Sequence, residues 1–457
     1  MLRKLLRWRA FGPPSLRLGP SFLALLAMSS RLFAVPVAGL LLLFAAGCQL
    51  QDGDDGTDVP SDTALVLGDD VLPDSAALER DRYSRAWWRA LGADSTALDS
   101  AAQAAARTNR ERLEDILPAQ MRGDSLHLPL GGNVAGPSVL RLQVLLDRAG
   151  FSPGVIDGRW GNNTESAVYW LQTAERLRPT GVVDSVTLRA LIVRAGRPDS
   201  LLTTHRLTAE DVAGPFVEIP EDIYEKAELD RLGYESLEEK LGELFHVAPA
   251  LLRRLNPGVR FDSTLAAGTA VRVPNVRDGR QTRGTVASLR ISADGHYLHA
   301  LGADSTILYH FPVTVGAAYD PSPEGQHTVR SVAENPWWHY QPRLLANVPD
   351  DRPDARIPPG PNNAVGVVWM GLSKEHYGIH GTSAPETIGY ASSAGCVRLT
   401  NWDALFLARQ VRPGVAVRFE ESRNAPAANQ DGTPEQRTAA PSVFFDPTHT
   451  TLALILH

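Results

Sequence analysis

Two short segments near the C-terminal end of the chain hold a histidine and a cysteine sixteen positions apart, His380-Gly381 and Gly395-Cys396. A cysteine attacks as its thiolate, and a thiol with an ordinary pKa of about 8.5 is only a few per cent ionised at neutral pH. It therefore needs a nearby base, and His380 can act as one. Gly395 lets the backbone approach a reacting carbonyl closely, which suits an oxyanion site made of main-chain N–H groups. The fold must bring both segments to one site.

The spacing of these residues resembles that of the L,D-transpeptidases with a YkuD-type catalytic domain. In that family His-Gly precedes a spacer with a glycine and then Ser/Thr-x-Gly-Cys-x-Arg, which this chain matches at His380, Gly381, Gly389, Ser393, Gly395, Cys396 and Arg398. Many members have a second histidine where this chain has Ala394, so a role for that imidazole is not carried over. Three upstream segments resemble family motifs in the family's order: Ser322-Pro323-Glu324-Gly325, Asn335-Pro336-Trp337-Trp338 and Ile357-Pro358-Pro359-Gly360-Pro361-Asn362-Asn363.

The resemblance implies acyl transfer on peptidoglycan, in which the thiolate of Cys396 expels the terminal D-alanine of a tetrapeptide stem and an amine then resolves the thioester as a 3–3 cross-link. His380 would be the base, and no cofactor is implied. The resemblance assigns an oxyanion or supporting role to Gly395, Ser393 and Gly381, and substrate binding to Arg398, Trp337 and Trp338. For Arg398, a structural ion pair remains an alternative to substrate binding. For Trp337 and Trp338, ordinary packing remains the alternative.

Two other functions stay open beside the transpeptidase. One is an L,D-carboxypeptidase or endopeptidase acting on the same stems with water as the acceptor. The other is a non-catalytic lipoprotein that tethers the cell wall through binding modules, against which the intact pair of Cys396 and His380 argues. A zinc site at His376 and His380 would need a helix and a glutamate after the first histidine. The chain has Tyr377 there and two glycines nearby, so we expect no metal.

The catalytic domain is expected at residues 285–420 as a mostly β assembly. Segments rich in β-branched and apolar residues alternate with turn signals such as Asp294-Gly295, and they predict strands at 286–291, 297–301, 307–315, 365–370 and 415–419. One helix is expected after the nucleophile, from Asn401 or Trp402 to Gln410. Residues 421–457 are a polar tail with apolar ends.

Residues 132–196 predict a compact three-helix unit. Apolar residues recur at helical spacing from Leu142, Thr164 and Leu188, and Asp157-Gly158 carries turn chemistry between two of the helices. The sequence pattern of residues 132–196 resembles the three-helix peptidoglycan-binding domain, and this resemblance implies binding to the cell wall.

Residues 224–276 resemble a LysM module, a small βααβ unit that binds N-acetylglucosamine polymers. The resemblance rests on the spacing of leucines, on Asn256-Pro257 and on the ending Gly268-x-x-Val271-x-Val273-Pro274. The usual opening Gly-Asp-Thr-Leu is replaced by Gly233-Tyr234-Glu235-Ser236-Leu237, so a spacer of the same fold that binds no sugar stays open.

The N-terminal 48 residues have the features of a secretory signal. Arg31 precedes an apolar run from Leu32 to Ala46 that ends before Cys48. The cysteine resembles that of a bacterial lipoprotein box, which implies lipidation of Cys48, a membrane anchor and an envelope location; Gln49 favours the outer membrane. A single spanning anchor is the alternative, although the run is shorter than the ~20 residues that a span needs. Residues 49–75 predict a flexible acidic linker, and residues 76–121 a helical segment of unknown role.

Size and charge agree with this division. At 457 residues the chain is long enough for about three domains. A net charge of −7, without a concentrated basic stripe, argues against nucleic acid as a partner. We therefore expect a multidomain α+β protein with a mostly β catalytic domain at its C-terminal end. Its expected partners are peptidoglycan stem peptides and glycan, together with the membrane.

Overall fold

The computed structural model describes residues 95–420 except 119, 120, 122, 263, 278, 281, 318, 319, 346, 347 and 350. The predictions for the signal segment 1–48 with Cys48, the linker 49–75, residues 76–94 and the tail 421–457 lie outside the described residues. Among the described helices, none has the length and apolar character that crossing a membrane requires.

The first described helix, α3, is shorter than the helix expected within residues 76–121. It runs from Ser95–Thr108, and a short 3₁₀ turn follows at Leu113–Asp115. The helix stops because Asn109 begins a turn, in which its Oδ1 accepts a hydrogen bond of 2.8 Å from the backbone N–H of Glu111. Ala102 and Ala105 of α3 share a small buried cluster with Val182 of the next unit. In the described part of the segment 76–121, helix is therefore confined to Ser95–Thr108 and the short turn at Leu113–Asp115.

Three helices follow, as the periodicity within 132–196 predicts: α4 (Pro137–Ala149), α5 (Asn162–Ala174) and α6 (Ser185–Arg194). Asp184 caps α6 by accepting a 2.7 Å hydrogen bond from the backbone N–H of Thr187. The Asp157-Gly158 turn is held by the buried Gln143, whose Oε1 accepts from both backbone N–H groups at 3.1 and 2.8 Å. The buried side chain of Gln143 thus fixes the turn between α4 and α5.

The next unit contains two helices between two paired strands. Strand β1 (Leu202–Arg206) pairs antiparallel with β2 (Ala270–Pro274), and α9 (Leu237–Leu244) and α10 (Pro249–Leu255) lie between them in the chain. The first strand is therefore upstream of the 224–276 range expected from the sequence. A segment with the short helices α7 (Ala209–Val212) and α8 (Ile223–Ala227) separates β1 from α9.

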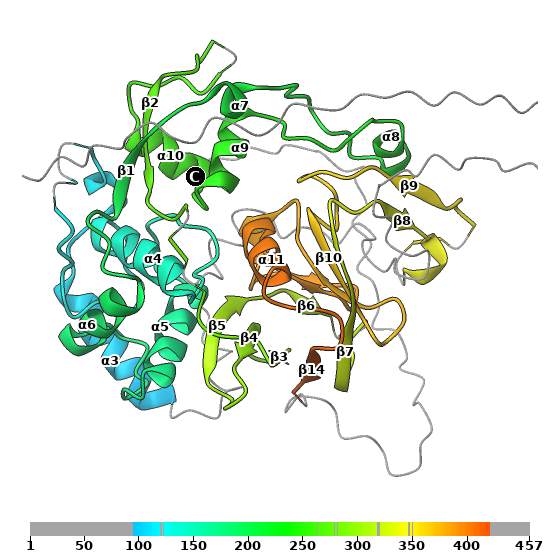
Figure 1. Ribbon diagram of the computed structural model, residues 1–457. Helices are drawn as coiled ribbons and strands as arrows, with labels where there is room; N and C mark the ends of the chain where they lie inside the picture. The colour runs from blue at the N-terminus through cyan, green and yellow to red at the C-terminus, as the bar shows by residue number, and fades with distance from the viewer. Residues whose placement is uncertain are drawn as a thin grey trace, which may run out of the picture. The chain divides into compact units, whose positions relative to one another are not determined.

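The C-terminal part of the chain is built on an eight-stranded sheet of order β13-β11-β10-β7-β14-β3-β4-β5. Its strands from β10 to β5 are labelled in Figure 1. In chain order its strands are β3 (Ser288–Ser292), β4 (Tyr297–Leu301), β5 (Ile307–Pro312), β7 (Gly325–Glu334), β10 (Val368–Leu372), β11 (Gly378–His380), β13 (Val397–Arg398) and β14 (Ala416–Phe419). Helix α11 (Asn401–Ala408) packs against β10 and β11. Two short pairs flank the sheet, β6 (Val315–Gly316) with β12 (Ser392–Ser393) and β8 (Trp338–Tyr340) with β9 (Ala355–Ile357).

The mostly β architecture expected for this region is confirmed. The sequence analysis missed β7, the longest strand, which pairs with both β10 and β14. Only Val329 of its ten residues is buried, so the strand lacks the apolar alternation that marks a half-buried strand.

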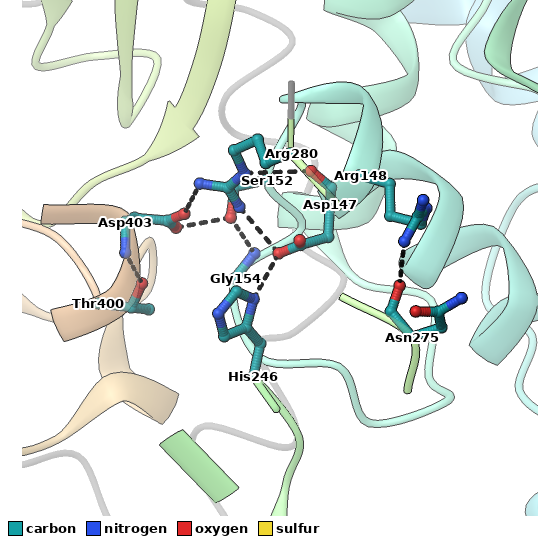
Figure 2. A network of polar contacts seen from close by, with 9 residues as sticks. All are labelled: Asp147, Arg148, Ser152, Gly154, His246, Asn275, Arg280, Thr400 and Asp403. Carbon is teal, nitrogen blue, oxygen red and sulfur yellow. Dashed lines mark hydrogen bonds and ion pairs between the residues drawn. The ribbon is translucent and has the colours of Figure 1, made fainter. Parts of the chain in front are cut away.

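A buried ionic network joins the three-helix unit to the catalytic sheet through Arg280, in the segment between β2 and β3 (Figure 2). Its guanidinium donates to Asp147 of α4 at 2.8 Å and to Asp403 of α11 at 2.7 Å. Ser152 adds a 2.6 Å hydrogen bond to Asp403, and His246 lies 2.8 Å from the carboxylate of Asp147. Both carboxylates are completely buried, so they depend on these partners for compensation of their charge.

The pKa of Asp147 shows that its partners outweigh desolvation. Burial raises this pKa, but the positive charges of Arg280 and His246 and their hydrogen bonds hold it at about 2, below the ordinary 3.8. Because the folded-state pKa is depressed, the stability that this group contributes is complete above pH 3.8. It is lost as the pH falls toward 2.

We expect Arg280→Met to lower the free energy of unfolding by about 3–5 kcal/mol, because it leaves two buried carboxylates without a cation. Arg260→Met is the matched control, because Arg260 is 85% exposed and its 2.8 Å pair with Asp262, screened by solvent, should contribute little to stability. Urea unfolding followed by tryptophan fluorescence measures both variants. Equal effects of the two substitutions would contradict the role given to the network.

Candidate active site

The parallel pair β11–β13 places the histidine and cysteine segments side by side. In its register Ile379 lies opposite Val397 and His380 opposite Arg398. Since side chains alternate between the faces of a sheet, Ile379 and Val397 share one face, where both belong to the large core of the sheet. Cys396, one position before the pair, points to the same face as His380. The two predicted catalytic residues are therefore brought together on one face of the sheet.

His380 is completely buried, and its orientation is defined. Its ring stacks on Trp369 of β10, with centroids 5.3 Å apart and an angle of 15° between the planes. Its Nδ1 lies 2.6 Å from the carbonyl oxygen of Gly381. A carbonyl only accepts, so Nδ1 carries the proton and Nε2 keeps a lone pair. Among the described residues, Nε2 has no hydrogen-bond partner.

The loop before Cys396 is fixed by hydroxyl groups. Ser393 donates a 2.6 Å hydrogen bond to the carbonyl oxygen of Cys396, and Ser322 donates one of 2.8 Å to that of Gly395. Gly395 has a φ of +95°, and a Cβ there would lie 2.8 Å from the ring of Tyr377. The position therefore requires glycine, as the family motif has it. Ser393 orders the cysteine loop.

The buried thiol and imidazole are both neutral in this state. Burial raises the pKa of Cys396 to about 12, against the opposing effects of a backbone hydrogen bond from Gly378 and the charge of Arg398. Burial, and then the charge of Arg398, lowers the pKa of His380 to about 3. The lone pair on Nε2 can accept a proton, but a pKa this low makes the imidazole a weak base in the described conformation.

Gly381 lies against Asn401, the first residue of α11. A Cβ on Gly381 would lie 2.2 Å from Oδ1 of Asn401, and the same oxygen accepts hydrogen bonds from the backbone N–H groups of Thr382 and Val367 at 3.1 and 3.2 Å. Asn401 thus holds the segments beside His380. The sequence analysis treated this asparagine only as a possible helix start, because its contacts come from segments far away in the chain.

Arg398 lies in β13, and its backbone exchanges hydrogen bonds of 2.9 and 3.1 Å with Thr314. The residue is 4% exposed, and its charge acts on both His380 and Cys396. Trp338 is also buried and belongs to the cluster that contains Cys396. Trp337 is half-buried, with the guanidinium of Arg356 4.1 Å from its ring centroid.

His376, the other histidine considered for zinc, lies in the turn before β11 rather than on a helix. Its carbonyl oxygen is 3.9 Å from the sulfur of Cys396. The two histidines therefore lack the helical spacing that the zinc motif needs. In the part of the chain that the structure describes, no group of three His, Cys, Asp or Glu residues is arranged to hold a metal.

One side of the cysteine cluster is formed by the segment between β1 and α9, which the sequence analysis did not connect with the site. Leu232 is completely buried in this cluster. Its backbone accepts a 3.2 Å hydrogen bond from Asn362 and donates one of 3.0 Å to Pro359. A Cβ on Gly360 would lie 1.9 Å from the carbonyl oxygen of Leu232, so this glycine permits the close approach.

Comparison with known proteins agrees with this geometry. The family model YkuD, described as an L,D-transpeptidase catalytic domain, matches residues 283–419, and PG_binding_1, described as a "Putative peptidoglycan binding domain", matches residues 135–191. This chain carries an L,D-transpeptidase catalytic domain. It is an enzyme of that type, with a peptidoglycan-binding domain ahead of the catalytic one.

Proteins named as L,D-transpeptidases are similar to part of the chain. The "Putative L,D-transpeptidase YkuD" of Bacillus licheniformis is 29% identical over 179 residues, which are 39% of this chain and 90% of the relative. The "Probable L,D-transpeptidase ErfK/SrfK" of Escherichia coli is 32% identical over 134 residues, 28% of this chain and 43% of the relative. A crystal structure of an L,D-transpeptidase from Xylanimonas cellulosilytica aligns with 65% of this chain and 98% of its own at 17% identity, with a TM-score of 0.29.

The neutral state of the catalytic pair predicts a pH dependence. Because the thiol pKa of this L,D-transpeptidase domain is raised, the rate at which iodoacetamide modifies Cys396 should rise steadily from about pH 7 to 10 without a plateau. At pH 7 the rate should be below that of free cysteine. Peptide mass spectrometry measures modification at this residue. A plateau with a midpoint below pH 7 would instead indicate a thiolate–imidazolium pair.

Proposed function

We propose that this protein is a peptidoglycan L,D-transpeptidase in which Cys396 is the nucleophile. The sulfur attacks the carbonyl that joins the third residue of a tetrapeptide stem to its terminal D-alanine. The C–N bond breaks, D-alanine leaves as the free amine, and a thioester remains. The amine of a second stem then attacks the thioester carbonyl, which forms the 3–3 cross-link and regenerates the thiol.

The observation that carries this proposal is the pairing of β11 with β13, which places His380 and Cys396 on one face with Nε2 of the histidine unpartnered. In the proposed reaction Nε2 takes the thiol proton as the sulfur attacks and returns a proton to the leaving amine. Main-chain N–H groups around Gly395 and Cys396 stabilise the oxyanion. Arg398 is the candidate for binding a substrate carboxylate, and Trp337 and Trp338 are the candidates for further contacts with the substrate.

Both catalytic side chains are completely buried in the described conformation. A stem peptide must contact the sulfur, so some of the residues that bury the site, here called the cover, move when substrate binds. The cover includes β8, β9 and the segment with Leu232, which share the buried cluster of Cys396. Exclusion of water by this cover favours an amine over water as the acceptor. We therefore rank cross-linking above an L,D-carboxypeptidase or endopeptidase activity.

Product analysis distinguishes these activities. The full chain, incubated with purified disaccharide-tetrapeptide, should release D-alanine and form a cross-linked dimer. Cys396→Ala should form neither product, and His380→Ala should lower kcat by about 10²–10⁴-fold, since it removes the general base. His327→Ala is the matched histidine control, because His327 lies in β7 and hydrogen-bonds the backbone of Glu324. The kcat of this variant should stay near the wild-type value.

Release of D-alanine without a dimer would instead favour the carboxypeptidase, with water as the acceptor. A folded chain that releases no D-alanine would contradict the proposal and leave the wall-tethering function.

We further propose that the protein is a lipoprotein of the cell envelope, anchored through Cys48 at the outer membrane after removal of the signal segment. Support comes from the apolar run that ends at Cys48, together with the peptidoglycan-binding domain, whose wall substrate lies in the same compartment. The βααβ arrangement of β1, α9, α10 and β2 supports a LysM-like unit that binds the glycan.

Lipidation can be tested in the native host with labelled palmitate. The wild-type chain should incorporate the label and sediment with outer-membrane vesicles, whereas Cys48→Ser should do neither. Cys396→Ser is the control, because it removes the other cysteine of the chain and should leave labelling unchanged. Equal labelling of wild type and Cys48→Ser would contradict the anchor.

A further inference from the structure

Glu243 lies on α9, outside the catalytic domain matched at residues 283–419, yet it contacts a side chain inside that domain. Its Oε1 accepts a 2.7 Å hydrogen bond from Nδ2 of Asn401, 158 positions away in the chain. Its Oε2 accepts a second hydrogen bond, of 3.2 Å, from the hydroxyl of Tyr234. The unit before the catalytic domain therefore reaches the first residue of α11 through one carboxyl group.

The amide of Asn401 uses its full hydrogen-bonding capacity. Nδ2 donates to Glu243 and, at 3.2 Å, to the carbonyl oxygen of Pro361. Oδ1 accepts from the backbone N–H groups of Val367 and Thr382. A side-chain amide offers two donors and one oxygen with two lone pairs, so all four are engaged. Glu243 supplies one of the two acceptors that make this orientation better than the flipped one.

The position of Asn401 controls the segment beside the catalytic base. Thr382, which donates to Oδ1, directly follows Gly381, and the carbonyl oxygen of Gly381 accepts the 2.6 Å hydrogen bond from Nδ1 of His380. A Cβ on Gly366 would lie 2.1 Å from Oδ1, as close as the 2.2 Å for Gly381. The amide oxygen is thus packed between two backbone segments, and a rotated amide would displace them.

The charge state of Glu243 agrees with a structural contact away from bulk solvent. Burial raises its pKa to about 8, so the carboxyl is neutral at pH 7. Burial likewise raises the pKa of Tyr234 and that of the neighbouring Glu239. A neutral acid keeps a carbonyl oxygen as an acceptor without placing a second charge near the site.

We propose that Glu243 is a positioning residue for the catalytic base: by fixing the amide of Asn401, it holds Gly381 and Thr382 where His380 can serve Cys396. The unit at residues 202–276 then completes the active site in addition to any role in wall binding. This inference rests on the proposed cysteine chemistry of the same site.

The test compares three variants of the full chain. Glu243→Leu removes the acceptor and should lower kcat for D-alanine release about 10- to 100-fold, with KM within about twofold, because the base is misplaced while the substrate cleft is unchanged. Glu243→Gln keeps a carbonyl acceptor for Asn401 and should retain kcat within about threefold. Glu238→Leu is the matched control on the same helix, since Glu238 pairs with Arg253 of its own unit, and it should equal wild type.

Two further measurements keep the inference separate from folding and from the proposed function. If Glu243→Leu does not fold, Tyr234→Phe, which removes one hydrogen bond to Glu243, should lower kcat about threefold. If the wild-type chain releases no D-alanine, the proposed function fails. The pH profile of the Cys396 alkylation rate then tests whether Glu243 positions His380. This profile should differ from the wild-type profile in Glu243→Leu, but not in Glu243→Gln or Glu238→Leu.

The inference is overturned by a folded Glu243→Leu variant with wild-type kcat and alkylation profile, or by equal losses in Glu243→Leu and Glu243→Gln. Wild-type kcat in Tyr234→Phe, with Glu243→Leu unfolded, also overturns it.

Discussion

The first turn of α11 is the point at which the units of this protein meet. Three consecutive side chains in it contact three different segments: Asn401 binds Glu243, Trp402 stacks on His246 with centroids 5.0 Å apart, and Asp403 binds Arg280 and Ser152. The turn begins directly after Thr400, whose hydroxyl accepts from the backbone N–H of Asp403 at 3.3 Å. These contacts therefore fix the segment of chain that follows Cys396.

This arrangement has two physical consequences. The buried charges of Asp147, Arg280 and Asp403 are compensated only when the three-helix unit and the sheet are docked, so the contact is specific as well as stabilising. The second concerns the proposed catalytic pair, His380 and Cys396, which is completely buried and neutral. In such an environment, fixed hydrogen-bond donors act strongly on charge that develops during a reaction, because water does not screen them. Docking of the units and the electrostatics of the site thus depend on the same packing.

Local patterns in the sequence predicted much of the fold. Helical periodicity located α4, α5 and α6, and β-branched runs located most strands of the sheet. The strand β7 was missed because it is mostly solvent-accessible, and the end of α3 because an Asx turn at Asn109 overrides helix propensity. Strand β1 was missed because a long insertion separates it from α9.

His380 and Cys396 could be proposed as the catalytic pair from the sequence because motif and chemistry coincide there. The residues that surround this pair could not be predicted. Leu232 and Glu243 lie more than a hundred residues before the nucleophile, and a glutamate on an amphipathic helix ordinarily predicts a solvent-exposed face. Only the tertiary packing shows that this carboxyl is buried against Asn401.

The most direct test of the central claim is intact-protein mass spectrometry of the full chain, quenched in acid during turnover of a tetrapeptide stem without an acceptor amine. The account predicts an adduct with the mass of the stem less D-alanine, mapped to Cys396 and absent from Cys396→Ala. Release of D-alanine that persists in Cys396→Ala, or an adduct on another residue, would contradict it.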